Sequence, residues 1–314
     1  MVLYTVRRLL QTIPILALVS VAVFLLIHAL PGDPVQAVVG SEATLAEIED
    51  ARRRLGLDRP LVEQFFGWLG GLFVGDLGTS YVTGKSVKDM LVTSLPVTMT
   101  LAIGATIVTL VLGVPAAISS AMNKGRVRDR SILVGSLVGI SVPSFVLGIA
   151  LILVFSVQLR WLPPSGYRSF GEYPLESLKY FVLPSISLGL LFAANVARVG
   201  RAATLDVMSQ DYIMTARAAM LRETSVRYRH ALKNAMIPIL TITGVTFGAL
   251  LGGTVVTERV FSLPGVGTLV INSITRRDYP VIQTTVLLIA ATYIIVNLIV
   301  DLLYAAVDPR VRHG

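Results

Sequence analysis

The amino-acid sequence predicts an all-α membrane protein with six transmembrane helices. Of its 314 residues, 54% are hydrophobic and 15% are charged, a composition too apolar for an ordinary soluble domain. Six apolar runs carry no charged side chain, and most reach the roughly 20 residues that a helix needs to cross the hydrocarbon core of a bilayer. The runs cover residues 9–29, 97–121, 131–159, 181–197, 235–257 and 279–300.

The first run is expected to remain as a membrane anchor. It follows Arg7 and Arg8, as the apolar core of a secretory signal would, but it is longer than the roughly 7–15 residues of such a core. No small-residue cleavage site follows it. Prolines in the runs are tolerable where neighbouring helices satisfy the carbonyl groups that they leave free. The prolines that interrupt or open these helices are Pro14, Pro115, Pro143, Pro184 and Pro238.

The distribution of Lys and Arg predicts that both termini lie in the cytoplasm. With the N-terminus inside, the inner segments carry 15 of the 27 basic residues although they are shorter than the outer segments. This orientation places the segment 198–235 in the cytoplasm and the segment 31–95 outside. The net charge of +8 therefore indicates orientation in a membrane rather than binding of nucleic acid. We expect a single domain, 1–314, because no internal repeat and no low-complexity linker is visible.

The long outer segment is predicted to contain two helices. Thr44 and Glu47 have the spacing of a capping box, and Gly56 is in place to end the helix that they begin. A second, amphipathic segment begins near Pro60. It either lies at the membrane interface with its aromatic rings at headgroup level, or packs on the bundle without touching lipid. The apolar side chains that it presents are Leu61, Phe65, Trp68, Leu69 and Leu72.

The segment 211–238 is polar and basic, although it lies between two long apolar runs. Its first half, 211–221, has apolar residues at helical spacing with Asp211 as a candidate N-cap, and its second half restarts at Thr224, another cap candidate. Two short helices joined by a turn, on the basic side of a membrane protein, make a docking surface. The alternative is a positively charged loop that only fixes the topology. The basic side chains of the second half are Arg227, Arg229, His230 and Lys233.

No catalytic or metal-binding constellation is visible. The chain has no cysteine, and its three histidines lie far apart. Residues 83–86 resemble the end of a phosphate-binding loop, but the first glycine of that motif would fall on Thr79. No acidic side chain lies in the middle of a run, so no ion relay is visible. A transporter of this kind takes its energy from a partner, most naturally one docked on 211–234. The alternatives are a self-sufficient secondary transporter or channel and an intramembrane enzyme.

Short motifs accompany 211–238 along the whole chain. They are Pro31-Gly-Asp-Pro34, Leu55-Gly-Leu-Asp58 with Pro60, Gly75-Asp-Leu-Gly78 with Ser80, Glu258-Arg-Val-Phe-Ser262 with Pro264-Gly265 and Gly267, Arg277-Asp-Tyr-Pro-Val281, and Asp308-Pro-Arg310. Together with 211–238, which resembles the cytoplasmic coupling loop (the EAA loop) of ABC importer permeases, they are similar to the peptide-transport branch of that family. One departure is Leu263, where the branch often has tryptophan.

The resemblance implies a type I importer permease in the cytoplasmic (inner) membrane of a bacterium. Its partners would be a second homologous permease, two cytoplasmic ATPase subunits and an extracytoplasmic binding protein. ATP and Mg²⁺ would be held by the ATPase subunits, so this chain would carry no cofactor and no catalytic residue. The cargo would be short peptides, meaning di- or oligopeptides. The alternatives are glutathione, nickel chelates or oligosaccharides carried by the same machinery, and more remotely an ion-coupled secondary transporter.

By the same resemblance, a coupling helix at about 212–221 would sit in a groove of the ATPase. Its small residues would allow close approach, and Arg217 could pair with an acidic rim. The branch usually has glycine at the position of Met220; if that glycine ends the helix, Met220 should prolong the helix or make it bulge. The coupling positions are Asp211, Tyr212, Thr215, Ala216, Arg217, Ala218, Met220 and Leu221.

The translocation path is predicted from a few polar residues. Ser141, Asn195 and Thr254 lie in the third, fourth and fifth runs, where they are candidates to face a wet cavity between two permeases. The alternative is that they make hydrogen bonds to the backbone or between helices. Glu258 is a further candidate. The turn that follows it, through Gly267, either dips back toward the pore or simply begins an outer loop.

Overall fold

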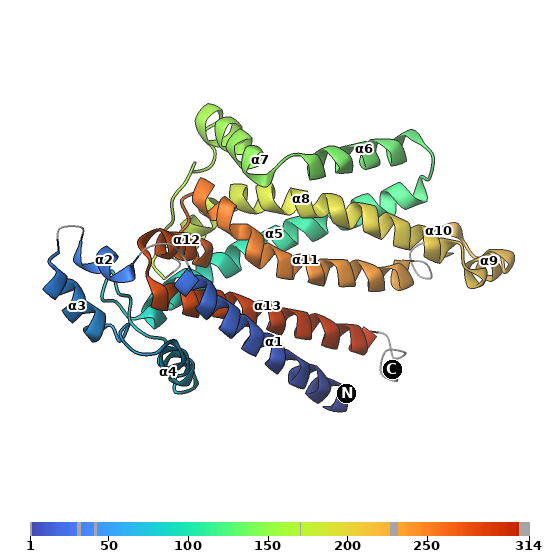
Figure 1. Ribbon diagram of the computed structural model, residues 1–314. Helices are drawn as coiled ribbons and strands as arrows, with labels where there is room; N and C mark the ends of the chain where they lie inside the picture. Colours follow the sequence, from blue (N-terminus) through green and yellow to red (C-terminus); the bar gives the residue numbers. More distant parts are fainter. Residues whose placement is uncertain (1, 30–32, 41–42, 170, 227–231, 308–314) are drawn as a thin grey trace. The chain divides into compact units, whose positions relative to one another are not determined.

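Helices and their connecting loops make up the computed structural model in the residues that it describes, which are 2–29, 33–40, 43–169, 171–226 and 232–307 (Figure 1). Among these residues the one extended pairing is an isolated bridge between Thr79 and Ser86. The helices are α1 (Val2–Ala29), α2 (Pro34–Val39), α3 (Leu45–Arg54), α4 (Leu61–Phe73), α5 (Val87–Met122), α6 (Val127–Ser141), α7 (Ser144–Leu151), the π-helix η1 (Ile152–Gln158), α8 (Pro174–Met208), α9 (Asp211–Ala218), α10 (Glu223–Ser225), α11 (Leu232–Val260), α12 (Val266–Arg276) and α13 (Tyr279–Val307).

Within the described residues, four helices are long and apolar enough to cross a membrane. They are α5, α8, residues Leu10–Ala29 of α1 and residues Tyr279–Ile299 of α13. Two further spans are bent: α6 continues into α7 and η1 at an angle of 98°, and α11 bends by 56° near residue 251. Counting each bent pair as one span gives the six transmembrane helices that the apolar runs predict.

Both bends have local causes in the sequence. Val142 precedes Pro143, and the residue before a proline is disfavoured in the helical region, so Val142 is extended with φ −88° and ψ 120°. Pro143 is then the N-cap of α7, which confirms that this proline opens a helix. The bend in α11 falls beside Gly252 and Gly253, a residue type that weakens helix interiors and is common at kinks.

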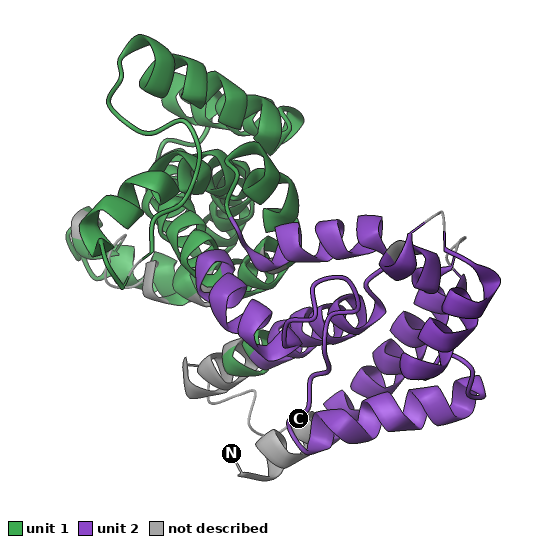
Figure 2. Ribbon diagram, turned by 90° about the vertical axis from the view of Figure 1, so that its left-hand side faces the viewer, with its two compact units in different colours: residues 1, 99–263, 296–314 green, residues 2–98, 264–295 purple. Residues whose placement is uncertain are grey.

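The chain folds into two compact units (Figure 2). Unit 1 contains residues 1, 99–263 and 296–314, and unit 2 contains residues 2–98 and 264–295. The expectation of one domain over the whole chain stays a prediction.

Helix α8 is central in unit 1, where it packs against α6, α7 and α11. Helix α5 approaches it closely at Gly189. A Cβ atom on Gly189 would lie 2.7 Å from the carbonyl oxygen of Ala105, closer than real Cβ atoms come, so this crossing requires glycine. The side-chain hydroxyl of Thr109 on α5 donates a hydrogen bond to the Gly189 carbonyl over 3.1 Å, which joins the two helices close to this crossing.

In unit 2 the predicted ends of α3 are confirmed. The Thr44 side chain accepts a hydrogen bond from the Glu47 N–H, and the Glu47 carboxylate accepts one from the Thr44 N–H over 2.8 Å. At the other end Gly56 has a φ of +67°, in the left-handed region. The N–H of Leu57 donates to the carbonyl of Arg52 over 3.0 Å, the hydrogen bond that defines a Schellman ending.

Helix α4 packs one of its faces on α1. Phe65 and Trp68 meet Phe24 of α1 at centroid distances of 5.3 and 6.3 Å. On the other face, Phe66 and Phe73 are 64% and 85% exposed. Packing against a neighbouring helix is therefore confirmed for this segment, whereas contact of its exposed face with lipid stays a prediction.

A buried polar cluster in unit 2 joins two of the short motifs noted in the sequence. The carboxylate of Asp278 accepts hydrogen bonds from the Ser80 hydroxyl and, over 3.0 Å, from the Tyr81 N–H. Ser80 accepts in turn from the N–H of Thr83 over 2.9 Å. These donors satisfy a carboxylate that is buried away from water. Burial, and then the nearby charge of Asp278, raises the pKa of the Tyr81 phenol above its ordinary value.

Candidate functional site

The predicted docking segment folds as two short helices, α9 and α10, after the end of α8. The N-cap of α9 is Gln210, so the expectation that Asp211 caps the helix is wrong by one residue. Gln210 is extended, and its carbonyl accepts from the N–H of Ile213 over 3.0 Å, so the backbone starts the helix without a side-chain cap. As the first helical residue, Asp211 still places its negative charge at the positive end of the helix dipole.

One side chain of α9 holds the helix in place. Ile213 is fully buried in a small core with Val207 of α8, Val226 after α10 and Ala235 of α11. Burying an isoleucine side chain contributes roughly 1.5–3 kcal/mol. The coupling helix is therefore packed on the ends of α8 and α11.

Most of the predicted coupling residues lie on the exposed surface. Ala216 is the exception, because it is half-buried and packs against the Ile213 core. Close approach of a partner at Ala216 stays a prediction, and Ala218 is the small coupling residue that is exposed at the surface. The exposed coupling residues are Asp211, Tyr212, Thr215, Arg217, Ala218, Met220 and Leu221.

Met220 ends the coupling helix in the way a glycine would. Its φ is +56°, in the left-handed region, and its side chain is 94% exposed. The Met220 N–H donates to the Arg217 carbonyl over 2.9 Å, and the Leu221 N–H donates to the Ala216 carbonyl over 3.3 Å. This is the Schellman pattern. The expectation that Met220 prolongs the helix or makes it bulge is therefore wrong: the backbone keeps the glycine conformation at a steric cost.

Two side-chain contacts fasten α9 to its surroundings. Arg217 Nε lies 2.9 Å from Glu223 Oε1 of α10, and Asn234 Nδ2 of α11 donates to the Tyr212 hydroxyl over 2.7 Å. The guanidinium that was expected to reach an acidic rim on a partner is thus paired within the loop. Both members of the Arg217 pair are about half exposed, so the pair itself contributes little stability.

The second half of the loop is described only in part. Helix α10 begins at Glu223 with Arg222 as its N-cap, so the expectation that Thr224 caps it is wrong. Arg227, Arg229 and His230 lie outside the described residues, and the side chain of Lys233 is not described.

The four predicted path residues have different surroundings. Ser141 is exposed at the end of α6, and its hydroxyl donates to the carbonyl of Leu137 over 2.9 Å. Asn195 of α8 accepts from Arg198 over 3.4 Å. Thr254 and Glu258 lie one turn apart on α11, and both are fully buried. Ser141 therefore makes the backbone contact given as the alternative, and a lining role for any of the four stays a prediction.

The sequence did not predict an ion pair that links α6 to α8 within unit 1. Asp129, in the first turn of α6, binds Arg201 of α8, which the sequence presents only as one of many orientation charges. Asp129 is the one acidic residue in the basic segment 122–130, and this isolation is the signal that points to a partner.

Comparisons with known proteins cover nearly the whole chain. The family model described as "Binding-protein-dependent transport system inner membrane component" matches residues 113–313, and the model of its N-terminal part matches residues 1–102. The chain is 44% identical over 310 residues to the glutathione transport system permease protein GsiC of Escherichia coli O6:H1, with 99% of each chain covered. The identity and coverage are the same for GsiC of Escherichia coli strain K12 and of Shigella dysenteriae serotype 1.

A solved structure shares the fold. It is described as an amino acid ABC transporter with histidines, and it superposes with a TM-score of 0.51. At 19% identity the match covers 71% of this chain and 94% of that chain, so it bears on the fold alone.

Proposed function

Because the chain belongs to the family of binding-protein-dependent transport system inner membrane components, we propose that it forms half of the translocation path of an ABC importer for short peptides. Its membership of the peptide, glutathione and nickel branch of ABC importer permeases rests on the family match and on the 44% identity over nearly the whole chain. Members of this family are transport subunits and not enzymes. The proposed place of ATP hydrolysis is therefore a partner subunit, which binds ATP and Mg²⁺.

The observation that best supports the proposal is that α9 packs against the protein on one face and is exposed on the other. Its inner face is fixed by Ile213 to the ends of two long helices, and its outer face carries most of the predicted coupling residues. A rigid helix of this kind can transmit a movement, because it cannot shift without moving the ends of α8 and α11. The proposed partner at this surface is the groove of an ATPase subunit.

The proposed cycle follows from this attachment. ATP would close a dimer of ATPase subunits, and the two coupling helices, one from each permease, would then draw together. The permeases would swing from an inward-facing to an outward-facing arrangement and accept cargo from an extracytoplasmic binding protein. In this arrangement both termini and the segment 198–235 face the cytoplasm, which agrees with the density of Lys and Arg in the inner segments.

The proposed cargo class is the short peptide. The motifs of the chain resemble those of peptide permeases, and the relatives described above are named for glutathione, which is itself a tripeptide. Glutathione is thus a member of the proposed class as well as a separate candidate. Nickel chelates and oligosaccharides are the remaining candidates for the same machinery.

Reconstitution tests the cargo. The transporter would be purified with the binding protein that accompanies it, and its ATPase activity and uptake measured with a dipeptide, glutathione, a nickel chelate and an oligosaccharide. Stimulation by binding protein loaded with a dipeptide or glutathione is expected. Stimulation by the nickel chelate or the sugar alone would contradict the peptide proposal, and uptake by this chain alone under an ion gradient would contradict an ATP-driven mechanism.

A bulky substitution tests the coupling surface. Ala218→Arg places a long charged side chain on the exposed face of α9, and it is expected to abolish stimulation of the ATPase by loaded binding protein. Ala202→Arg is the matched control, because Ala202 is exposed on α8 and precedes the segment 211–238, which holds the predicted coupling residues. Normal stimulation and uptake in the Ala218→Arg transporter would contradict docking at α9.

A further inference from the structure

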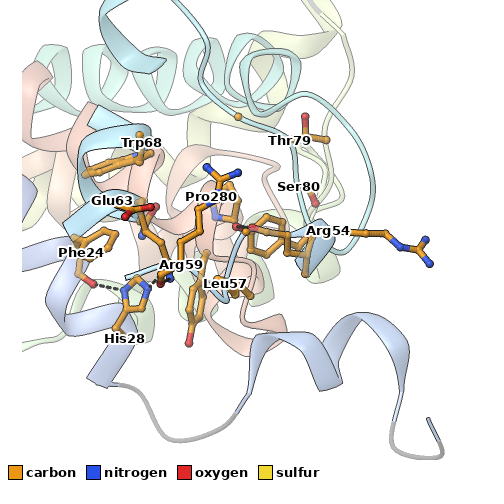
Figure 3. Close-up of a pocket in the computed structure, with 18 of the residues that line it drawn as sticks. Phe24, His28, Arg54, Leu57, Arg59, Glu63, Trp68, Thr79, Ser80 and Pro280 are labelled. Atoms are coloured by element: carbon orange, nitrogen blue, oxygen red, sulfur yellow. Dashed lines mark hydrogen bonds between the residues drawn. The ribbon is translucent and has the colours of Figure 1, made fainter. Parts of the chain in front are cut away.

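A cavity of about 490 Å³ lies in unit 2, whereas the coupling loop belongs to unit 1 (Figure 3). Phe24 and His28 in the last turns of α1 form one wall, and Glu63 and Trp68 of α4 form another. The cavity is completed by residues 77–81 and by the start of α13 at Tyr279. Its volume is that of a site for a small molecule or a headgroup.

Two opposite charges line this cavity without meeting each other. Arg59, just before α4, and Glu63, in its first turn, are both exposed, and neither side chain has a hydrogen bond or ion pair to a described residue. The backbone beside them is fixed, because Gln64 Nε2 donates to the Arg59 carbonyl over 2.8 Å. Arg54 also lines the cavity, but it is paired with Asp50 and points away from the other labelled side chains (Figure 3). The side chains of Arg59 and Glu63 are therefore free to bind a ligand that carries a negative and a positive group.

Aromatic rings surround these charges. Phe24 and Trp68 stack at a centroid distance of 6.3 Å with an angle of 24°, and Tyr81 and Tyr279 line the same cavity. Aromatic faces attract an ammonium group, especially where water is partly excluded. His28 is already engaged, since its ring nitrogens lie 2.8 Å from the Phe24 carbonyl and 3.3 Å from Gln64 Oε1. The positive group of a ligand is thus expected beside Glu63 and the rings, and the negative group beside Arg59.

The cavity also lies at the end of a helix that is apolar enough to span a membrane, which is where lipid headgroups are found. It begins at the last turn of α1, where the charge-free apolar run 9–29 ends, and large side chains on that run are exposed, including Leu18 and Leu26. Helix α4 adds a second exposed apolar face, with Phe66 and Phe73. Aromatic residues at the end of a transmembrane helix typically mark the interface between hydrocarbon and water.

From this arrangement we infer that the cavity binds the headgroup of a zwitterionic aminophospholipid, of the phosphatidylethanolamine type. The guanidinium of Arg59 binds the phosphate, and the carboxylate of Glu63 with the aromatic walls binds the ammonium group. The acyl chains run along the exposed apolar side chains of α1 and α4. In the orientation proposed above, the lipid belongs to the outer leaflet. Binding of this lipid is independent of the cargo and of the coupling loop.

Lipid titration followed by native mass spectrometry tests the inference. The transporter, purified with its partners in detergent, would be titrated with short-chain phosphatidylethanolamine and with phosphatidylglycerol, which lacks the ammonium group. Phosphatidylethanolamine is expected to bind about tenfold more tightly, since a charge-assisted hydrogen bond contributes at least that factor. Arg59→Gln should weaken both lipids. Glu63→Gln should weaken phosphatidylethanolamine alone, and should leave phosphatidylglycerol unchanged.

Arg53→Gln is the matched control. Arg53 is exposed on α3, is paired with Glu49 and does not line the cavity, so its replacement should leave both affinities unchanged. Equal binding of phosphatidylethanolamine by the unmodified, Arg59→Gln and Glu63→Gln transporters would overturn the inference. A free zwitterion, dialanine, is the second probe. If dialanine displaces the lipid from the unmodified transporter at comparable concentration, the cavity is a site for soluble zwitterions and the lipid assignment is wrong.

Discussion

Asp129 and Arg201 form a two-point ion pair in unit 1. Arg201 Nε lies 2.7 Å from Asp129 Oδ1, and Arg201 Nη2 lies 2.8 Å from Asp129 Oδ2. The Ser120 hydroxyl and the N–H of Gly125 also donate to this carboxylate. The Asp129 side chain is 3% exposed and that of Arg201 20%. The pair thus ties the end of α5, the start of α6 and the C-terminal part of α8 together at one point.

Removal of the arginine should destabilise unit 1. Arg201→Gln leaves a buried carboxylate without its counter-charge, which costs about 3 kcal/mol. Arg201→Lys should recover part of this loss, because an ammonium group cannot make the same two-point contact. Arg198→Gln, three residues earlier and exposed, should change little. Thermal unfolding of the four chains in one detergent measures the effect, and equal midpoints for Arg201→Gln and the unmodified chain would refute it.

Truncation of Ile213 should release the coupling helix. Ile213→Ala removes the largest fully buried side chain of its small core, at a cost of roughly 2–5 kcal/mol. The other contacts that hold α9 are an exposed ion pair and one hydrogen bond, so the loss should appear as local opening of 211–226 and as weaker stimulation of the partner ATPase. Met214→Ala is the control, because Met214 is exposed on the same helix. Limited proteolysis with mapping of the cut sites measures the opening; an uncut loop in Ile213→Ala would show that other contacts suffice.

Much of this fold can be predicted from local composition, because whether a segment can span a membrane is decided by the apolar side chains of that segment itself. The six runs, the capping box at Thr44 and the ending at Gly56 need no information from distant residues, and the structure contains all of them. The direction of the helices after the breaks does not follow in the same way. Pro143 predicts that a helix opens there, but the 98° angle depends on the packing of α7 against α8.

The parts that the sequence does not predict depend on contacts between distant segments. The inward position of Ala216 follows from where Ile213 packs, and that packing involves α8 and α11. Ser80 and Asp278 are 198 residues apart, so nothing in either motif shows that they meet. The start of α9 is also set by the extended backbone of Gln210, whose side chain makes no capping hydrogen bond. The residue type at this position therefore does not reveal where the helix begins.

The raised pKa of Tyr81 predicts a loss of stability in alkali. The ordinary pKa of tyrosine is 10.0, and burial together with the charge of Asp278 raises the value in the folded chain. Folding is stabilised by the neutral form of the Tyr81 phenol. This stabilisation is fully present at pH values below the pKa that tyrosine has in the unfolded chain. The stabilisation is lost as the pH rises through the pKa of Tyr81 in the folded chain, because tyrosine in the unfolded chain releases its proton at a lower pH.

Unfolding midpoints at about pH 8 and about pH 10.5 measure this effect. Tyr81→Phe should reduce the difference between the two midpoints, because it removes the group that titrates. Tyr173→Phe, at an exposed tyrosine, should leave the difference unchanged. A difference that is the same in Tyr81→Phe as in the unmodified chain would show that the alkaline loss arises elsewhere.

Substitution of Met220 by glycine should stabilise the coupling loop. A non-glycine residue in the left-handed region costs roughly 1–2 kcal/mol, and part of this is offset by the greater backbone freedom of glycine in the unfolded chain. Met220→Gly is therefore expected to gain about 1 kcal/mol, which slows amide hydrogen exchange in α9 roughly fivefold. Met214→Gly, within the same helix at an exposed position, should do the opposite, because glycine weakens helix interiors by about 1 kcal/mol. Faster exchange in both variants would mean that the Met220 side chain itself stabilises the loop.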